Sequence, residues 1–230
     1  MHIRLMFQKL DTARFLSHLE MQQMWQRSLR RAKVPLAMSK GFNPHPKISF
    51  GSALPVGVAS LAEYLDVELR ENIELTGLKE KINACLPIGF KVIKIAEIPP
   101  KSKPLMAIIN RAEYTIEQRV KVCSDDIATI TDKFLGQEVI TIERETKSGT
   151  KLKDIRSGIF SLKAQCAKSE LIITTLVQTG SQGNVRPGEV LNTFLGFANL
   201  EPIGPEKITR KGLFVNVNGK TVTPLEVLEG

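Results

Sequence analysis

Two of the three histidines and one nearby lysine are the candidate catalytic residues of this chain. His2, His18 and His45 all lie within the first 60 of the 230 residues, and Lys47 follows His45 closely. An imidazole exchanges a proton near neutral pH, and a lysine ammonium stabilises negative charge on a reacting phosphate. His18, His45 and Lys47 are therefore candidates for a metal-independent site that cleaves RNA.

Basic residues give the same segment a second possible function, the binding of nucleic acid. Residues 1–60 contain nine Lys and Arg but two Asp and Glu, so they carry seven of the eight net positive charges. Forked Arg donors suit phosphate groups, and an aromatic side chain in a loop suits stacking on an unpaired base. The candidate RNA-binding residues chosen on these grounds are Arg14, Arg27, Arg30, Arg31, Lys40, Phe42, Asn43, His45 and Lys47.

Several of these residues also have a structural interpretation that the sequence leaves open. His18 can be an ordinary surface residue in the first turn of a helix, and Phe42 can anchor its loop in the core. Gly180 and Gly183 are interpreted as turn glycines, because no Lys-Ser or Lys-Thr follows them as in a phosphate-binding loop. Trp25 is predicted to be a core residue.

The three cysteines, Cys85, Cys123 and Cys166, are far apart in the sequence and odd in number. They form none of the closely spaced patterns typical of zinc sites or iron–sulfur clusters, and no complete nucleotide-binding motif is present. The sequence therefore predicts buried free thiols, no metal site and no bound cofactor.

Composition limits the class of protein. With 42% hydrophobic residues, the chain can bury one large core or two small ones. No stretch approaches the roughly 18–20 apolar residues of a membrane span, and Arg4 introduces charge too early for a signal peptide. These features predict a cytoplasmic protein without a membrane partner.

Hydrophobic periodicity indicates the elements that must position the candidate residues. Ser17 and Glu20 have the Ser-x-x-Glu form of a capping box, so a helix is predicted to begin there, and Pro35 stops it. The other elements predicted in this part are a strand at 3–8, extended segments at 36–39 and 47–52, a strand at 63–69, a helix at 75–85 and a strand at 91–97. This βαββαβ order is typical of a ferredoxin-like unit.

A linker rich in proline and lysine, residues 98–104, is followed by a second set of elements. They are strands at 113–120, 138–144, 159–166 and 170–178, a helix from Ser124 or Asp125 to Leu135, a helix at 187–198, and a hairpin at 208–225 that turns at Asn218-Gly219. The predicted fold is α+β, with two tandem ferredoxin-like (βαββαβ) units and antiparallel sheets. The predicted domains are a basic one at 1–98 and a second at 105–230 that ends in the hairpin.

Several motifs resemble those of the bacterial radical SAM-linked proteins, a family of unassigned function. The resemblance covers nearly the entire chain and depends on Ala13-Arg14-Phe15-Leu16-Ser17-His18-Leu19-Glu20, Arg30-Arg31-Ala32, residues 39–51, residues 54–60 with 63–67, Asp154-Ile155-Arg156, and residues 185–190. Members occur alone or fused to B12-binding radical SAM enzymes, so the resemblance implies an accessory role beside such an enzyme. Arg156 and Arg186, which lie in these motifs, join the candidate RNA-binding residues.

Three functions remain open at this stage. The favoured one is a non-catalytic RNA-binding module that presents rRNA or tRNA to a radical SAM enzyme for modification or processing. The second is an endoribonuclease that uses His18 and His45. The third is a protein–protein adaptor, for which the acidic residues Glu63 and Glu68 and the nearly neutral second half would supply the surface.

Overall fold

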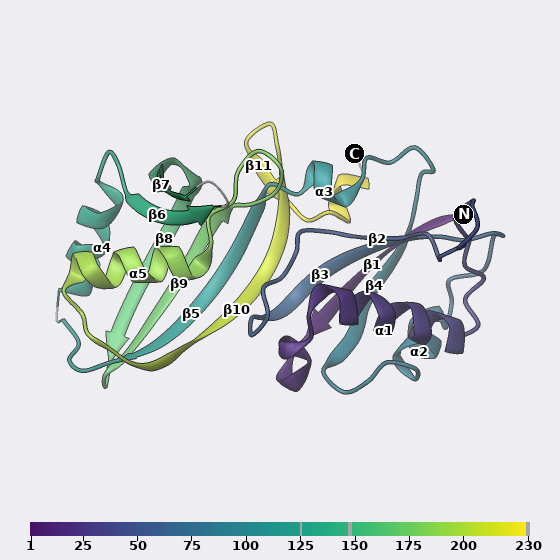
Figure 1. Cartoon of the computed structure of the whole chain (residues 1–230), viewed down its shortest axis with the longest axis horizontal. Helices are drawn as coiled ribbons and strands as arrows, with labels where there is room; N and C mark the ends of the chain where they lie inside the picture. Colours follow the sequence, from purple (N-terminus) through teal and green to yellow (C-terminus); the bar gives the residue numbers. More distant parts are fainter. Residues whose placement is uncertain (125, 147–148, 229–230) are drawn as a thin grey trace. The chain divides into compact units, whose positions relative to one another are not determined.

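The computed structural model describes residues 1–124, 126–146 and 149–228 (Figure 1). Contacts divide the chain into unit 1, which is residues 1–110 together with 212–230, and unit 2, which is residues 111–211. Both units combine helices with strands, so the predicted α+β class is confirmed. None of the described helices is long and apolar enough to cross a membrane.

Unit 1 is built around strand β1 (His2–Lys9). This strand pairs antiparallel with β3 (Ala59–Glu68) on one side and with β4 (Phe90–Ile98) on the other. Because β2 (Ile48–Phe50) pairs antiparallel with β3, these strands follow the order β4-β1-β3-β2. The alternate β1 residues Ile3, Leu5 and Phe7 are buried, as expected of a strand with one face on a core.

Helices α1 (His18–Arg31) and α2 (Leu78–Asn83) pack on the core of unit 1. Trp25 of α1 and Ile82 of α2 belong to the same buried cluster as Phe7, which confirms the prediction for Trp25. The predicted capping box is present, because the Glu20 N–H donates to Ser17 Oγ at 3.3 Å and the Ser17 N–H donates to the Glu20 carboxylate at 2.8 Å. The shorter elements of unit 1 are η1 (Asp11–Phe15), α3 (Leu105–Ile108), β11 (Lys220–Val222) and η3 (Glu226–Leu228).

Unit 2 is centred on β9 (Glu170–Gln178), which pairs antiparallel with β5 (Arg111–Val120) and β8 (Ile159–Ala167). The strand order here is β10-β5-β9-β8, where β10 (Pro202–Val217) begins in unit 2 and ends in unit 1. The remaining elements of unit 2 are α4 (Ile127–Leu135), α5 (Pro187–Ala198), η2 (Arg156–Gly158) and a separate pair of strands, β6 (Thr141–Thr146) and β7 (Gly149–Asp154). Asp126 is the N-cap residue of α4, and Asp125 lies outside the described residues.

The main sheet, which contains all the described strands except β6 and β7, is partly mixed in strand direction. The prediction that all sheets are antiparallel is therefore only partly correct. The alternation of apolar and polar residues predicts where strands lie but not the direction of a neighbour that is distant in sequence. A crossover connection can return a strand in either direction.

The prediction of three buried free thiols is wrong. Cys123 and Cys166 form a disulfide with their Cα atoms 5.5 Å apart, and Cys85 is free and half-buried. The fold brings the pair together because the turn between β8 and β9 lies beside the end of β5, where the Val120 N–H donates to the Ser169 carbonyl at 2.9 Å. A separation of 43 residues gives no sign of this proximity in the sequence.

Candidate nucleic-acid interface

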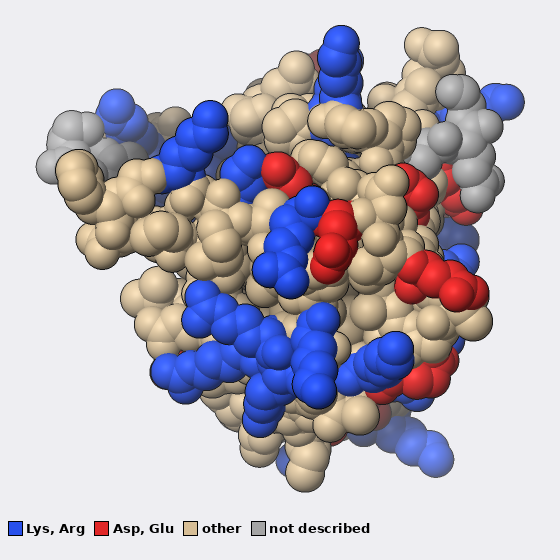
Figure 2. Space-filling model, turned by 90° about the vertical axis from the view of Figure 1, so that its right-hand side faces the viewer, with Lys and Arg blue, Asp and Glu red and all other residues tan. Residues whose placement is uncertain are grey.

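The C-terminal end of α1 presents several basic side chains to solvent. Met21, Trp25 and Leu29 face the core, so Arg27, Arg30 and Arg31 lie on the exposed side of the helix. Lys and Arg side chains gather into one patch on the end of the molecule at which α1 finishes (Figure 2). These cations also complement the negative end of the helix dipole.

The basic residues at this end of α1 differ in how much of their charge is free to bind a ligand. Arg31 donates to the Cys85 carbonyl and, at 3.4 Å, to Ser28 Oγ, so it helps to hold α1 against the segment after α2. Within the described part of the chain, Arg27, Arg30 and Lys33 have no ion pair with a carboxylate. We refer to the four residues Arg27, Arg30, Arg31 and Lys33 as the α1 basic patch.

A short closed loop follows the α1 basic patch in the chain. The Ser39 N–H donates to the His45 carbonyl at 2.8 Å, and the His45 N–H donates to Ser39 Oγ at 3.0 Å. Phe42 lies at the tip of this loop with a relative exposure of 106%. We call residues 39–45 the Phe42 loop. Because Phe42 makes no core contact, the interpretation of this residue as a core anchor is wrong.

The polar residues of the Phe42 loop are also open to solvent. Lys40, Asn43 and His45 are all exposed. Fully exposed aromatic side chains are uncommon, since leaving such a ring in water forgoes roughly 1.5–3 kcal/mol of burial. The loop therefore combines an uncovered ring with hydrogen-bonding groups and one cation.

Two of the three candidate catalytic residues, His18 and Lys47, lie apart from each other. The His18 ring packs edge-on against Phe50 with centroids 5.4 Å apart, on the face of the sheet that carries α1. Lys47 instead binds both carboxylate oxygens of Glu68 at 2.9 Å. Glu68 alternates along β3 with the core residues Leu65 and Val67, so it lies on the opposite face. His18 and Lys47 are thus on different faces of the sheet of unit 1.

The remaining predicted arginines have mainly local contacts. Arg14 in η1 lies 4.8 Å from the Phe15 ring centroid, and its Nε is buried without a hydrogen bond among the described residues. In unit 2, Arg156 donates to the Leu135 and Ile159 carbonyls, which holds the end of α4. Arg186 is the exposed N-cap residue of α5, and its N–H donates to the Glu189 carboxylate at 2.9 Å.

The structure also shows how much of the predicted positive charge is hidden. Arg4 is fully buried and binds the Asp66 carboxylate at 2.7 and 2.9 Å, and Lys9 is buried with its ammonium donating to the Leu16 carbonyl. Together with Lys47 and Arg31, at least four of the nine basic residues in the first 60 are therefore bonded within the protein.

Sequence reasoning missed two exposed lysines of unit 1. Lys101 and Lys103, which it assigned to a linker, help to line a cavity of about 680 Å³. Because prolines flank these lysines, the segment was interpreted as a spacer, and the contribution of the lysines to a cavity was not predicted. A run of lysines within a linker is the signal that could have indicated it.

Comparisons with known proteins give a family and a fold. A family model described as an uncharacterized protein conserved in bacteria (DUF2344) matches residues 2–187. No curated protein matches the chain. A solved structure, titled crystal structure of a Cbf5-Nop10-Gar1 complex, is similar with a TM-score of 0.51 and 10% sequence identity. That match covers 92% of this chain and 48% of the other, so this chain spans about half the length of the structure that it matches.

Proposed function

This chain belongs to the bacterial family DUF2344, and we propose that it is an RNA-binding protein whose binding surface is the α1 basic patch with the Phe42 loop. The observation that carries the proposal is the complete exposure of Phe42 at the tip of a closed loop. The loop begins six residues after Lys33, so it stays close to the basic patch along the chain. An exposed ring, and cations that have no carboxylate partner in the described chain, are the two features that single-stranded nucleic acid requires of a binding surface.

The cations of the α1 basic patch and the Phe42 ring would make different contacts with RNA. Arg27, Arg30 and Lys33 bind phosphates and release counterions, which gives affinity without sequence preference. Phe42 stacks on an unpaired base, and the exposed Asn43 amide can donate to and accept from a base edge. The preferred RNA is therefore a single-stranded loop or end, where bases are free to leave their neighbours.

The architecture and partner that we propose follow from strand order and from family resemblance. In each unit the four main strands follow an order that corresponds to 4-1-3-2 along the chain, with a helix after the first strand and another after the third. We propose that both units are variants of the ferredoxin-like fold, which is used by many RNA-binding modules. The proposed partner is a radical SAM enzyme that modifies or processes rRNA or tRNA.

Contacts of the residues chosen for the two alternative functions give those functions less support. A nuclease that uses His18 and His45 with Lys47 would need these groups at one phosphate, and His18 and Lys47 lie on opposite faces of the sheet. The acidic surface proposed for an adaptor is also reduced, since Glu63 is buried against the Ser60 hydroxyl at 2.7 Å and Glu68 binds Lys47.

Replacement of Phe42 by Ala tests the proposed surface directly. We expect the affinity for a single-stranded RNA to fall about tenfold, since base–aromatic stacking contributes roughly 1–3 kcal/mol. Fluorescence anisotropy with a labelled oligonucleotide would measure the dissociation constant. Phe160→Ala is the matched control, because Phe160 is also an exposed aromatic residue but belongs to unit 2. Equal affinities of the two variants and the unaltered protein would remove Phe42 from the interface.

A further inference from the structure

Strand β4 has one paired side and one open side, and hydrogen bonds elsewhere in unit 1 show which of its backbone groups face the open side. The Leu69 N–H donates to the Met1 carbonyl at 2.8 Å, and the Met1 amino group donates to the Leu69 carbonyl at 3.4 Å. In an antiparallel pair, hydrogen-bonded and non-hydrogen-bonded residue pairs alternate. Because the β1–β3 register is unbroken from His2 to Phe7, the odd-numbered residues of β1 bond to β3 and the even-numbered residues bond to β4.

This alternation fixes the orientation of the second half of β4. His2, Arg4 and Met6 pair with Ile98, Ala96 and Lys94, so these three β4 residues direct their N–H and C=O groups toward β1. Ile95 and Glu97 lie between them. Their backbone groups therefore point away from β1, toward the open side of the strand.

Contacts within unit 1 close the first half of the same edge. A register shift between Met6 and Phe7 leaves Ile93 as an extra residue on β4. On the other side of this shift the alternation is reversed, so the backbone N–H and C=O groups of Val92 point away from β1. The Asn83 carboxamide satisfies Val92 completely, because it accepts the Val92 N–H at 2.7 Å and donates to the Val92 carbonyl at 3.1 Å. The Phe90 N–H donates to the Pro87 carbonyl at 3.2 Å. Within the described chain, Ile95 and Glu97 have no comparable backbone partner on the open side.

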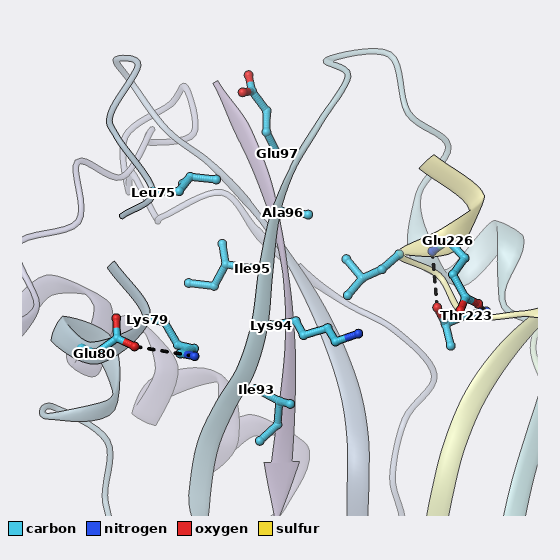
Figure 3. A pocket seen from close by; sticks show the side chains of 11 residues that line it. Leu75, Lys79, Glu80, Ile93, Lys94, Ile95, Ala96, Glu97, Thr223 and Glu226 are labelled. Carbon is cyan, nitrogen blue, oxygen red and sulfur yellow. Dashed lines mark hydrogen bonds and ion pairs between the residues drawn. The ribbon is translucent and has the colours of Figure 1, made fainter. Parts of the chain in front are cut away.

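A cavity of about 600 Å³ lies along this unpaired stretch (Figure 3). Ile95 points to the side where Leu75 and Lys79 lie, whereas Ile93 and Lys94 point to the side of Thr223 and Glu226. Residues 93–97 thus form the floor of a groove that has a wall on each side. All of its lining residues belong to unit 1.

The groove carries three carboxylates, on Glu80, Glu97 and Glu226, and two ammonium groups, on Lys79 and Lys94. The Lys79 ammonium lies 3.6 Å from the Glu80 carboxylate, and the Glu226 carboxylate accepts the Thr223 N–H at 2.6 Å. Hydrogen bonds from the Thr223 backbone N–H and the Thr223 side chain lower the pKa of Glu226, and the positive charge on Lys94 adds a smaller effect. A groove with a small excess of negative charge and several apolar residues offers little to a polyanion, in contrast to the α1 basic patch.

We propose that residues 93–97 of β4 bind an extended segment of a partner protein by strand addition. Backbone groups of the segment would bond to Ile95 and Glu97, and apolar side chains at alternate positions would pack on Leu75 and Ile95. A single extended segment fits between the two walls of the groove. A second copy of this chain, pairing through the same strand, would bring the walls of its own groove into collision with the walls of the first. This site shares no residue with the proposed RNA surface and is independent of that proposal.

Amide hydrogen exchange, followed by NMR, tests the orientation of the edge. In the protein alone we expect rapid exchange at Ile95 and Glu97 and slow exchange at Lys94 and Ala96. The probe is the blocked peptide acetyl-Thr-Ile-Thr-Ile-Thr-amide at millimolar concentration. We expect it to slow exchange at Ile95 and Glu97 at least about tenfold, while the same peptide N-methylated at every residue has no effect.

Three results would overturn the proposal. Slow exchange at Ile95 and Glu97 in dilute protein would show that the edge is already covered, and protection that rises with protein concentration alone would show pairing between copies. Absence of protection by the peptide would exclude strand addition at this site. Single-stranded RNA is the control ligand, and we expect it to leave both amides unchanged whether or not RNA binds elsewhere.

Proline substitutions supply a second, independent test. Glu97→Pro removes an N–H that has no bond to β1, so we expect the melting temperature to stay nearly unchanged while peptide binding weakens more than about tenfold. Glu97→Ala, which keeps the N–H, should bind the peptide within about threefold of the unaltered protein. Ala96→Pro removes an N–H directed at β1 and should strongly destabilise unit 1. Unimpaired peptide binding by Glu97→Pro would refute the proposed site.

Discussion

Arg27, Arg30 and Arg31 lie close together on α1, but their guanidinium groups have different roles. Arg31 donates to the Cys85 carbonyl, whereas Arg27 and Arg30 have no carboxylate partner in the described chain. A charge that is free in the isolated protein can be neutralised by RNA without loss of an internal contact. Binding and stability should therefore respond to different members of this group.

The double variant Arg27→Gln with Arg30→Gln tests this difference for RNA binding. We expect the slope of log K against log salt to become shallower by about 1.4–1.8, since each phosphate contact contributes roughly 0.7–0.9. Measurements of RNA affinity at several salt concentrations would give the slope. Arg31→Gln is the comparison, because it should lower the melting temperature, whereas the double variant should melt as the unaltered protein does. An unchanged slope in the double variant would exclude these two residues from the interface.

At the residue scale, sequence reasoning predicted exposure better than partners. It placed Arg27 and Arg30 correctly on the solvent side of their helix, because helical periodicity determines which side chains leave the core, but it left Phe42 open between base stacking and a core anchor. It could not predict that Arg4 and Lys47 are neutralised by Asp66 and Glu68. Those carboxylates lie on β3, and the register of that strand is a property of the fold and not of any local pattern.

At the element scale, the start of α1 has a carboxylate whose titration should be visible in stability. Two hydrogen bonds with Ser17, from its hydroxyl and from its backbone N–H, lower the pKa of Glu20 below its usual 4.5. The folded-state pKa is the lower one, so the contribution of Glu20 to stability is present above pH 4.5 and is lost as pH falls through the lowered value. We expect Glu20→Gln to reduce the melting temperature at neutral pH.

The same comparison at acidic pH provides the control for Glu20. There the difference in melting temperature between Glu20→Gln and the unaltered protein should shrink, because the protonated carboxyl of Glu20 no longer differs in charge from the amide. Thermal unfolding followed by circular dichroism from pH 3 to 7 would measure it. A difference that does not depend on pH would contradict the assigned role of the carboxylate.

The disulfide ties the segment after β5 to the end of β8, which are separated by β9 in the sheet. It closes a loop of 43 residues, for which chain entropy gives about 4 kcal/mol of stabilisation, with roughly 2–4 kcal/mol typical of measured disulfides. We expect Cys166→Ser to lower the stability of unit 2 by about that amount. Cys85→Ser, at the free and half-buried cysteine of unit 1, is the matched control and should have a much smaller effect.

A reducing agent gives an independent check on the same bond. In its presence, the Cys166→Ser variant and the unaltered protein should unfold at nearly the same denaturant concentration. If the two proteins differ equally with and without reductant, the effect of the substitution comes from packing and not from the disulfide.

Features that depend on a local sequence pattern were predicted well. Features that depend on contacts between segments distant in sequence were predicted poorly. The capping box located the start of α1, and alternation located β1, β3, β5 and β9. The disulfide and the partly mixed sheet could not be predicted, because both depend on which strands become neighbours. The closed and open halves of β4 also have no sequence signature, since Asn83 can satisfy Val92 only after α2 and β4 have packed.

At the scale of the whole molecule, unit 1 is assembled from two separate parts of the chain. Residues 212–230 join residues 1–110, and the Pro224 carbonyl accepts an N–H of the buried Arg4 at 2.8 Å. Removal of residues 212–230 would leave that donor without its partner. Breaking a hydrogen bond of a buried charged group costs roughly 1.5–3 kcal/mol.

We therefore expect a fragment of residues 1–110 to be unstable or unfolded. The same fragment, with residues 212–230 attached through a Gly-Ser linker, should regain a cooperative thermal transition. Circular dichroism and calorimetry would measure both. A fragment of residues 1–110 that melts as cooperatively as the linked form would show that the C-terminal segment is dispensable for unit 1.

The course of strand β10 also determines the order of events while the protein is being made. Residues 212–230, which include the end of β10 and Pro224, complete unit 1, but they are synthesised only after all of unit 2. At about 5–20 residues per second, residues 111–211 take roughly 5–20 s to translate. During that interval the first 110 residues lack the Pro224 carbonyl as a partner for the Arg4 side chain. This nascent intermediate is the stage at which we expect a chaperone to be most useful.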